Sequence, residues 1–477
     1  MPFRTLLAVI LLVAPATAQL DDATRKLSRD IFKQLIEINT TDSSGNNTAA
    51  AQAMAKRLLD AGYPAGDVKV LAPTGRANKG NLVARLRGRP NNALKPILII
   101  GHLDVVEALR ADWTTDPFQL VEKDGYFYGR GTQDMKSQDA MLMTAFIRFR
   151  KEGYQPPRDL ILALTSDEEG GTANGVDWLL KNHRDLVDAE FVLNADSGGV
   201  MTEKGKPIDV EVAAAEKLYA DFQLTVTNPG GHSSMPVPDN AIYHLADALG
   251  RLEHSSFPFE LNGVTRLYFE QLATHESAQN AADMKAIVRN PPDQAAVARL
   301  SADPHFNSLL HTTCVATRLN AGHANNALPQ TAQAIVNCRI LPGHSPEEVR
   351  RQLMGKLADP KVTVRYVDGS SGKVSDRAPD QTGPLPGAPR ADVLKALEGV
   401  ADALWPGAPV VVDMETGASD SKYTIAAGMP SFGVGEEAID HDDIRAHGRD
   451  ERLRVSSYYE GVDFFYRFLK AVASVGL

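Results

Sequence analysis

Acidic and histidine residues follow several apolar runs of this sequence, at the point where each run ends. His102 and Asp104 come shortly after the run 96–100 and lie two residues apart, so both side chains point to one side of an extended chain. Neutral imidazole is a zinc ligand, and a carboxylate on its other ring nitrogen fixes the tautomer. Alone, this tripeptide is better explained as a structural histidine with a polar neighbour. The metal-ligand interpretation therefore depends on the other motifs.

Two further acidic motifs follow. Asp134 ends a glycine-rich turn that begins at Gly129, and alone it would be interpreted as the N-cap of a helix. Residues 167–169 read Asp-Glu-Glu after the apolar run 160–166, and such neighbours repel one another unless a cation or solvent relieves them. Because adjacent residues of an extended chain point in opposite directions, one Glu can bind a metal while the other faces a water molecule as general base.

The same residue types occur at two later positions. Asp196 follows the predicted strand 190–194, and His447 follows a strand and a polar loop near the C-terminus. The carboxyl ends of strands in an open α/β sheet meet in one crevice. Two metal ions bridged by a carboxylate would occupy such a crevice, polarise a substrate carbonyl and lower the pKa of a shared water molecule. The joint pattern therefore predicts a metal-dependent hydrolase.

The elements that must position these residues alternate between helical periods and short apolar runs. We expect helices at 23–38, 49–61, 135–152, 176–182 and 392–404. We expect strands at 81–87, 96–100, 159–165, 190–194, 410–413 and 431–435. This alternation predicts an α/β fold with a mixed sheet flanked by helices. The catalytic domain is expected to be discontinuous, formed by residues 19–211 plus 385–477.

The middle of the chain, residues 212–370, has a different predicted order: strand, helix, two strands, helix and strand. This is the βαββαβ order of ferredoxin-like domains, here inserted into the first domain. About sixty residues separate the first helix from the second strand, far more than a normal connection. We therefore expect a helical insertion near 255–310, and we expect residues 371–384 to be the return linker.

Composition excludes some classes of function. The 477 residues include 50 Lys and Arg against 60 Asp and Glu, a net charge of -10, and without a dense basic cluster this argues against nucleic-acid binding. Two cysteines are too few for a thiolate zinc site, so His, Asp and Glu must hold any metal. Cys314 and Cys338 lie on consecutive predicted strands, and simple hairpin pairing would place them opposite each other. Either a disulfide or two buried thiols would result.

Residues 1–18 have the form of a secretory signal peptide. Arg4 precedes the apolar run 5–14, and Ala-Thr-Ala follows at 16–18. An apolar run this short does not span a hydrocarbon core of about 30 Å. We expect an exported protein without a stable membrane anchor, periplasmic or extracellular after cleavage near Ala18.

Taken in order, the motifs resemble those of the dinuclear zinc exopeptidase and aminoacylase family, which includes glutamate carboxypeptidase, carboxypeptidase S, aminoacylase and succinyl-diaminopimelate desuccinylase. The matching motifs are H-x-D at 102–104, G-R-G-x-x-D-x-K at 129–136, D-E-E-x-G at 167–171, G-H-S-S at 231–234 and H-G-x-x-E-R at 447–452. The likeness spans nearly the whole mature chain. The residues within these motifs are most similar to those of the carboxypeptidase S branch of the family.

The resemblance implies two Zn²⁺ ions per chain, with Co²⁺ or Mn²⁺ as possible substitutes. It implies that Glu168 is the general base and that Asp104 is the partner of a metal-binding histidine. Asp134 would bridge the two ions, with His102 and Asp196 completing one site and Glu169 and His447 the other. The metal ligands implied are His102, Asp134, Glu169, Asp196 and His447.

The resemblance also implies that the inserted domain is a lid, through which a homodimer can form. His232 would stabilise the oxyanion of the reaction, and in dimeric relatives it does so in the neighbouring subunit's site. Without the other motifs, His232 would be interpreted as part of a helix N-terminal turn. Asn326 and Arg339 would hold a substrate carboxylate, a task that suits a guanidinium fork. Gly417 would shape the substrate pocket.

We therefore expect a zinc metallopeptidase or amidohydrolase that cleaves a peptide or N-acyl amide bond next to a free carboxylate. A metal-bound water, deprotonated by Glu168, would attack the bond. The substrate would be a small peptide or an N-acyl amino acid. The alternative is a protein of this fold that acts as a binding or dimerisation module without catalysis, but such a protein would be expected to lose Glu168 or a ligand.

Overall fold

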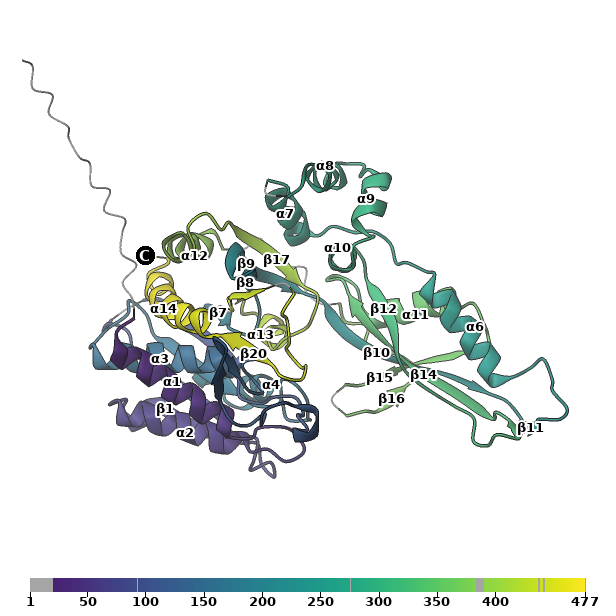
Figure 1. The fold of residues 1–477 in the computed structure, drawn as a ribbon, viewed down its shortest axis with the longest axis horizontal. Helices are drawn as coiled ribbons and strands as arrows, with labels where there is room; N and C mark the ends of the chain where they lie inside the picture. Colours follow the sequence, from purple (N-terminus) through teal and green to yellow (C-terminus); the bar gives the residue numbers. More distant parts are fainter. Residues whose placement is uncertain are drawn as a thin grey trace, which may run out of the picture.

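The computed structural model describes residues 20–91, 93–274, 276–369, 371–382, 390–435, 438–440 and 442–476. The predicted signal peptide lies outside these residues, as does the end of the predicted linker. Two large sheets, each with its own helices, make up most of the described chain, and the smaller one extends away from the larger one (Figure 1). No helix in the described ranges has the length and apolar character needed to cross a membrane.

The larger sheet mixes parallel and antiparallel strands. In order across the sheet, its strands are β1 (Val68–Leu71), β2 (Asn81–Leu86), β6 (Leu160–Thr165), β3 (Ile97–His102), β7 (Phe191–Asn194), β18 (Ser431–Gly433), β9 (Lys206–Glu216), β8 (Gly199–Glu203) and β19 (Ala438–Asp440), and β17 (Val410–Glu415) pairs with β9 beside this path. Strand β3 is parallel to both of its neighbours. The predicted mixed α/β sheet is thus confirmed.

Helices bury both faces of this sheet. One face packs against α1 (Asp22–Glu37), α2 (Asn47–Asp60), α3 (Lys136–Lys151), α12 (Ala391–Leu404) and α14 (Val455–Val472). The other packs against α4 (Gly175–Asn182), α5 (Arg184–Val187) and α13 (Ser421–Ala426). Along β3, Ile99 belongs to the first core and Ile100 to the second, which explains why this strand is a continuous apolar run.

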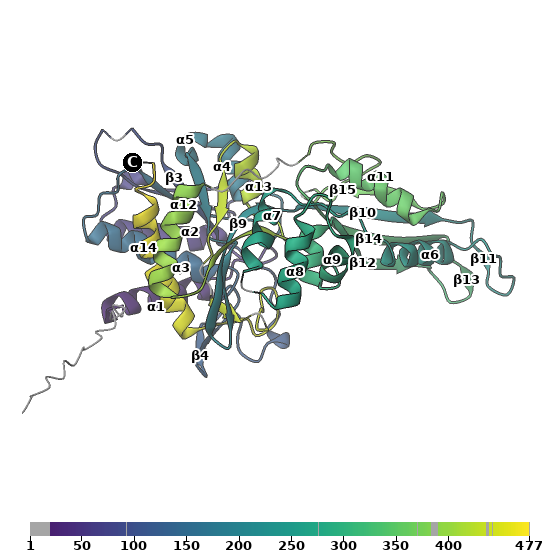
Figure 2. The ribbon, with the colours of Figure 1, turned by 90° about the horizontal axis from the view of Figure 1, so that it is seen from above.

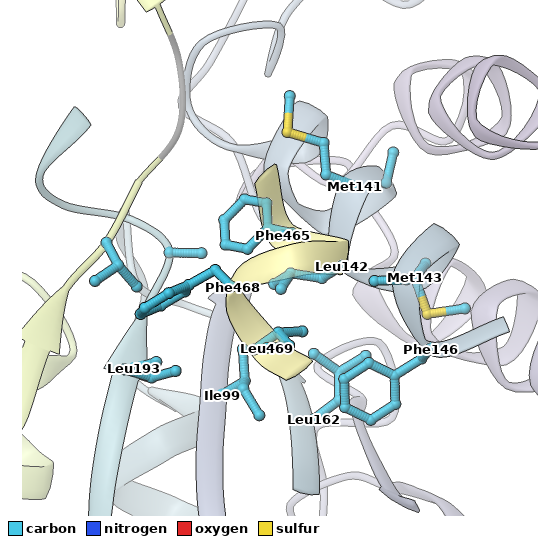
Figure 3. Close-up of a cluster of buried hydrophobic side chains, with 14 of the residues drawn as sticks. Ile99, Met141, Leu142, Met143, Phe146, Leu162, Leu193, Phe465, Phe468 and Leu469 are labelled. Atoms are coloured by element: carbon cyan, nitrogen blue, oxygen red, sulfur yellow. The ribbon is translucent and has the colours of Figure 1, made fainter. Parts of the chain in front are cut away.

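Helix α14 is absent from our predicted elements, although its phenylalanines recur at helical spacing. Phe465, Phe468 and Leu469 lie over Ile99 and Leu162 of the sheet (Figure 3). Burial of an aromatic or leucine side chain contributes about 1.5–3 kcal/mol, so this helix is a main source of the core. The antiparallel pair β8 and β9 was also not predicted.

A small third sheet joins two distant parts of the chain. Its strand order is β20 (Arg452–Arg454), β5 (Tyr126–Tyr128) and β4 (Val121–Lys123). Pairing of Arg452 with Tyr128 brings the C-terminal H-G-x-x-E-R motif beside the glycine-rich turn at Gly129. The 3-10 turns η1 (Ala65–Asp67) and η2 (Arg110–Asp112) also belong to this half of the molecule.

The second sheet has its own core. In order, its strands are β12 (Thr313–Ala321), β14 (Thr331–Ile340), β10 (Leu218–Thr227), β15 (Thr363–Val367) and β16 (Val374–Ser375). Helices α6 (Ala241–Glu253) and α11 (Pro346–Leu357) pack on one face. Along the chain the order is β10, α6, β12, β14, α11 and β15. Strand β16 lies within the stretch where we expected only a linker, and it pairs with β15.

Four short helices separate α6 from β12: α7 (Gly263–Leu272), α8 (Ala278–Ile287), α9 (Gln294–Leu300) and α10 (Pro304–Leu310). Tyr268 and Phe269 of α7 belong to a third core, which also contains Val411 of β17. The insertion therefore packs back on the larger sheet.

Cys314 and Cys338 are directly paired residues of β12 and β14, and they form a disulfide. Of the two alternatives that the sequence left open, the structure has the disulfide. It closes a loop within the second sheet, joining its edge strand to its neighbour.

A short ribbon extends beyond the second sheet. It consists of β11 (Gly231–His232) paired with β13 (Ala327–Leu328). In both views this ribbon lies at the end of the second sheet that is farthest from the larger sheet (Figures 1 and 2).

Candidate metal centre

The predicted crevice forms where β6, β3 and β7 end. His102, the last residue of β3, lies opposite Thr165, the last residue of β6. Asn194, the last residue of β7, lies opposite Ile100. The chain segments that follow β6 and β7 therefore leave the sheet at the edge where His102 lies, as the strand-end rule requires.

Five side chains converge there as two groups of three that share Asp134. In the first group, His102 Nε2 lies 3.0 Å from Asp134 Oδ1 and 3.2 Å from Asp196 Oδ1. In the second, His447 Nε2 lies 3.0 Å from Asp134 Oδ2 and 2.9 Å from Glu169 Oε1. The structure thus brings together all five residues that the resemblance implied as ligands, in the implied grouping.

These donor sets fit divalent metal ions. Each group offers one imidazole nitrogen and two carboxylates, which are ligand types of zinc. Each carboxylate oxygen of Asp134 lies 3.0 Å from the Nε2 of a different histidine, so a cation in either group would contact both a carboxylate oxygen and an imidazole nitrogen. Asp134 and Glu169 raise the pKa of His447 to about 10, so the cluster favours positive charge where the three side chains meet.

Asp104 departs from its expected contact. We expected its carboxylate to pair with the imidazole of His102, but His102 Nδ1 contacts the backbone oxygen of Asp104 at 3.0 Å, and the carboxylate Oδ1 is 3.8 Å away. A carbonyl fixes the tautomer as a carboxylate would, and leaves Nε2 for a metal. The Asp104 carboxylate instead accepts hydrogen bonds from the backbone N–H groups of Glu168 and Glu169, at 3.2 Å and 3.0 Å. Asp104 therefore holds the backbone of this acidic loop.

Glu168 belongs to neither group, and its side chain lines the pocket beside them. The pocket has a volume of about 230 Å³ and is lined by Asp134, Glu168, Glu169, Asp196, Ser197, Arg339, Glu415, Gly417, Ala418, Ser419 and His447. Burial, together with the negative charge of Asp196, raises the pKa of Glu168 well above its ordinary value. A raised pKa suits a carboxylate that accepts a proton near neutral pH.

Glu451 is a site residue to which the sequence gave no role. It is fully buried, and it accepts a hydrogen bond from Arg130 Nη1 at 2.6 Å. It also accepts from the backbone N–H groups of Gly131, Gln133 and Asp134, at 3.1, 2.6 and 3.2 Å. These contacts hold the turn that carries Asp134. Arg130 belongs to the motif at 129–136 and Glu451 to the motif at 447–452. Their place in these motifs is the signal by which the sequence could have identified them.

A second set of contacts that the sequence did not predict holds the acidic loop from the other side. Lys79 is buried, and its Nζ lies 2.5 Å from Asp167 Oδ1 and 2.6 Å from Asp42 Oδ1. Asn81 Oδ1 accepts a hydrogen bond from the backbone N–H of Ser166 at 3.0 Å. Lys79 lies just before β2 and Asn81 is its first residue, so the two anchor the loop to the sheet.

Two of the predicted substrate contacts, Arg339 and Gly417, line the pocket. Arg339 is the residue before the last one of β14, in the second sheet, and it lines the same pocket as the metal-site residues of the larger sheet. Its guanidinium lies over the ring of Tyr219, 4.8 Å from the centroid, and its Nε donates to Asn337 Oδ1 at 3.2 Å. These neighbours hold the guanidinium at the pocket wall.

His232 and Asn326 do not line the pocket, as far as the chain is described. His232 is exposed and pairs with Ala327 across the β11–β13 ribbon, and the backbone N–H of Ser233 donates to the oxygen of Asn326 at 3.1 Å. The two residues are thus neighbours, at the end of the second sheet away from the metal centre. Within one chain, the expected oxyanion contact and the expected pairing of Asn326 with Arg339 do not form.

Comparison with known proteins identifies the family. The model of peptidase family M20/M25/M40 matches residues 98–471. The chain belongs to this family. It is therefore a metallopeptidase or amidohydrolase, as the sequence predicted.

Individual proteins agree with the family. A probable carboxypeptidase S-like 2 of Dictyostelium discoideum is 30% identical over 390 residues, 80% of this chain and 72% of that protein. The N-fatty-acyl-amino acid synthase/hydrolase PM20D1 of Xenopus tropicalis is 28% identical over 394 residues, 81% of this chain and 74% of that protein. The M20 family metallo-carboxypeptidase Sso-CP2 of Sulfolobus solfataricus has the same fold, with a TM-score of 0.69 at 18% identity, over 95% of this chain and 100% of that chain.

Proposed function

We propose that this M20 enzyme cleaves a peptide or N-acyl amide bond next to a free carboxylate, using two zinc ions and Glu168 as general base. One observation carries the proposal: the two groups of ligands that share Asp134 lie in one pocket with Glu168 and Arg339. A metal centre, a proton acceptor and a carboxylate-binding cation are the parts that such a hydrolysis needs.

His102 and Asp196 would hold one ion, and Glu169 and His447 the other, with Asp134 holding both. When bound, the ions polarise the scissile carbonyl and lower the pKa of water. Glu168 accepts a proton from the attacking water and returns it to the leaving nitrogen. A carbon–oxygen bond forms, the amide carbon–nitrogen bond breaks, and the products are a carboxylate and an amine.

Arg339 binds the free carboxylate of the substrate. Its guanidinium offers two parallel N–H donors, the geometry that a carboxylate accepts. Because Arg339 comes from the second sheet while the metal ligands come from the larger one, a bound substrate connects the two parts of the molecule. Gly417 leaves the pocket wall open, with no atom within 4 Å of where a Cβ would stand.

The active enzyme is a homodimer in which His232 of one chain reaches the pocket of the other. Two features support this proposal. His232 is exposed at the far ribbon, away from the metal centre of its own chain. Strand β12 is the exposed edge of the second sheet and carries Val315 and Leu319, with 61% and 67% of their surfaces exposed. An exposed apolar edge strand is a surface that proteins normally cover.

The protein is exported, as its first residues predict. The disulfide between Cys314 and Cys338 supports export, because disulfides persist in oxidising compartments and are rare in reducing ones. The export signal itself lies outside the described residues.

Hydrolysis by the purified mature protein tests the proposed function. Release of free amino acids would be measured from a panel of dipeptides and N-acyl amino acids, before chelation, after chelation and after zinc is restored. We expect release that disappears with the chelator and returns with zinc. Release that survives removal of all bound metal would contradict the proposal, and so would no release from any panel member with two ions bound per chain.

A further inference from the structure

Glu415 is a charged residue of the pocket that the proposed chemistry does not use. It is the last residue of β17, it is half-buried, and it lines the pocket of the metal centre. Its Oε1 accepts a hydrogen bond from the backbone N–H of Gly198 at 3.0 Å, which fixes the carboxylate in place. No Lys or Arg forms an ion pair with Glu415 among the residues that the structure describes.

The groups around Glu415 favour contact of its carboxylate with a positively charged group. Beside it, Glu216 is half-buried, and one oxygen of Glu216 has no hydrogen-bond partner in the described chain. Asp413, two residues earlier on β17, is buried. Burial raises the pKa of Glu415, so an ammonium group in contact with it would favour its ionised form.

The rest of the pocket lacks the features of a site for a long apolar chain. Ala418 is the one apolar side chain among the described lining residues, and the volume of about 230 Å³ lies below the roughly 300–1,000 Å³ of typical ligand pockets. Arg339 is the one Lys or Arg on the lining. The pocket therefore presents a fixed cation and an uncompensated anion, in a space suited to a small molecule.

We propose that Glu415 is a specificity-determining residue that binds a positively charged group of the substrate, so that the pocket selects zwitterionic dipeptides over N-acyl amino acids. The inference rests on the proposed hydrolase function. Arg339 binds the carboxylate at one end of the dipeptide, and Glu415 binds the free α-amino group at the other. The scissile amide then lies between them, beside the metal ligands and Glu168.

Two substrates that differ only in this charge give the sharpest test. Glycyl-leucine and N-propionyl-leucine have the same amide and the same carboxylate, and an ammonium group in the first replaces a methyl group in the second. For the wild-type enzyme we expect kcat/KM to be at least about tenfold higher for glycyl-leucine, the factor that corresponds to about 1.4 kcal/mol. Equal values, or a preference for N-propionyl-leucine, would overturn the inference.

The variant Glu415→Gln keeps the shape of the side chain and removes its charge. We expect it to lose most of the preference through a higher KM for glycyl-leucine, while kcat/KM for N-propionyl-leucine stays within about twofold. Glu398→Gln, at an exposed position of α12 outside the pocket, is the matched control and should change neither value. A Glu415→Gln variant that loses the same factor on both substrates would mean that Glu415 acts only in the structure.

Other pairs of Gly-X and N-propionyl-X substrates extend the test if leucine does not suit the pocket. If no pair is hydrolysed by the zinc-loaded protein, the proposed function fails. The inference is then tested by measuring how strongly the protein binds each member of a pair. The thermal shift of Glu168→Gln with each member of a pair would be compared. A larger shift with Gly-X that disappears when Glu415→Gln is added supports the charge contact, and equal shifts overturn it.

Discussion

Asp134 connects the two halves of the metal centre, because each of its carboxylate oxygens faces a different histidine. Its position depends on the turn that carries it, because the backbone N–H groups of Gly131, Gln133 and Asp134 donate to one carboxylate oxygen of Glu451. Arg130 balances the charge of this buried carboxylate. The position of Asp134 is therefore set by a residue more than three hundred positions away along the chain.

We predict that Glu451→Gln weakens zinc binding. Loss of the charge leaves buried Arg130 unpaired and loosens the turn, so we expect about 10–100-fold lower zinc affinity together with a lower Tm. Titration with zinc after chelation measures the first, and thermal unfolding the second. The double variant Arg130→Met, Glu451→Gln removes the unpaired charge, and its Tm should partly recover. Unchanged zinc affinity in that stable double variant would contradict this role of Glu451.

The sequence was sufficient to predict which acidic and histidine side chains meet in the crevice, but not the residues that hold them in place. His102, Asp134 and Asp196 each follow a strand or turn that the apolar pattern marks, so their meeting point could be predicted. Lys79 and Glu451 act through partners that are distant in sequence, and although Glu451 belongs to a motif, the sequence does not indicate which residues either of them contacts. The carboxylate of Asp104 accepts from the backbone N–H groups of Glu168 and Glu169, since the backbone oxygen of Asp104 already contacts His102 Nδ1.

At the scale of elements, the passage from β9 to β10 connects the two sheets. Lys217 is the single residue between these strands, and it is fully buried. Its Nζ donates to the backbone oxygen of His311 at 2.7 Å, just before β12 begins. Lys217 therefore holds together the two chain segments that enter the second sheet.

This buried lysine predicts a specific pH dependence of stability. Burial lowers the pKa of Lys217 to about 7, against about 10.4 for a lysine in an unfolded chain. Between these values the unfolded chain binds more protons than the folded one, so the contribution of Lys217 to the free energy of unfolding rises with pH. The slope for one proton is at most about 1.4 kcal/mol per pH unit.

Lys217→Met removes this contribution. We expect the wild type to gain stability relative to the variant between pH 7 and pH 9, by on the order of 1–2 kcal/mol. Urea unfolding of both proteins at pH 7, 8 and 9 measures the difference. A constant difference across this range would show that Lys217 keeps its ordinary pKa in the folded protein.

Most elements with strong apolar patterns were predicted, helix α14 being an exception, and short elements without such a pattern were not. The strands β3, β6 and β7 lie within a few residues of their predicted bounds. The short strands β4, β5, β19 and β20 were missed, because three residues carry no periodic signal. Strand β16 was taken for linker because it lies in a polar, glycine-containing stretch and pairs through only two residues.

At the scale of the whole molecule, the chain separates two parts of the implied site. Arg339 faces the metal centre, while His232 and Asn326 lie at the distant ribbon (Figure 1). A sequence carries no information on whether a motif acts within its own chain or in a neighbour. A dimer that places this ribbon over the partner's pocket would complete the site, as proposed above.

Complementation between inactive variants tests the dimer. Glu168→Ala lacks the base and His232→Ala lacks the oxyanion contact, so each homodimer should have low activity. Coexpressed, the two variants should recover about a quarter of wild-type activity, because half of the dimers would contain one complete site. Light scattering would establish the dimer. No recovery in confirmed heterodimers, or full activity of His232→Ala, would contradict a contribution of His232 to the partner's site.

The central claim, that Glu168 transfers protons beside a metal centre that it does not hold, is tested most directly by Glu168→Ala. Zinc content and kcat would be measured on the same preparation, beside wild type. We predict two zinc ions per chain in both proteins and a kcat about 10²–10⁴-fold lower in the variant. Activity close to wild type would contradict the claim, and so would a loss of zinc in proportion to the loss of activity.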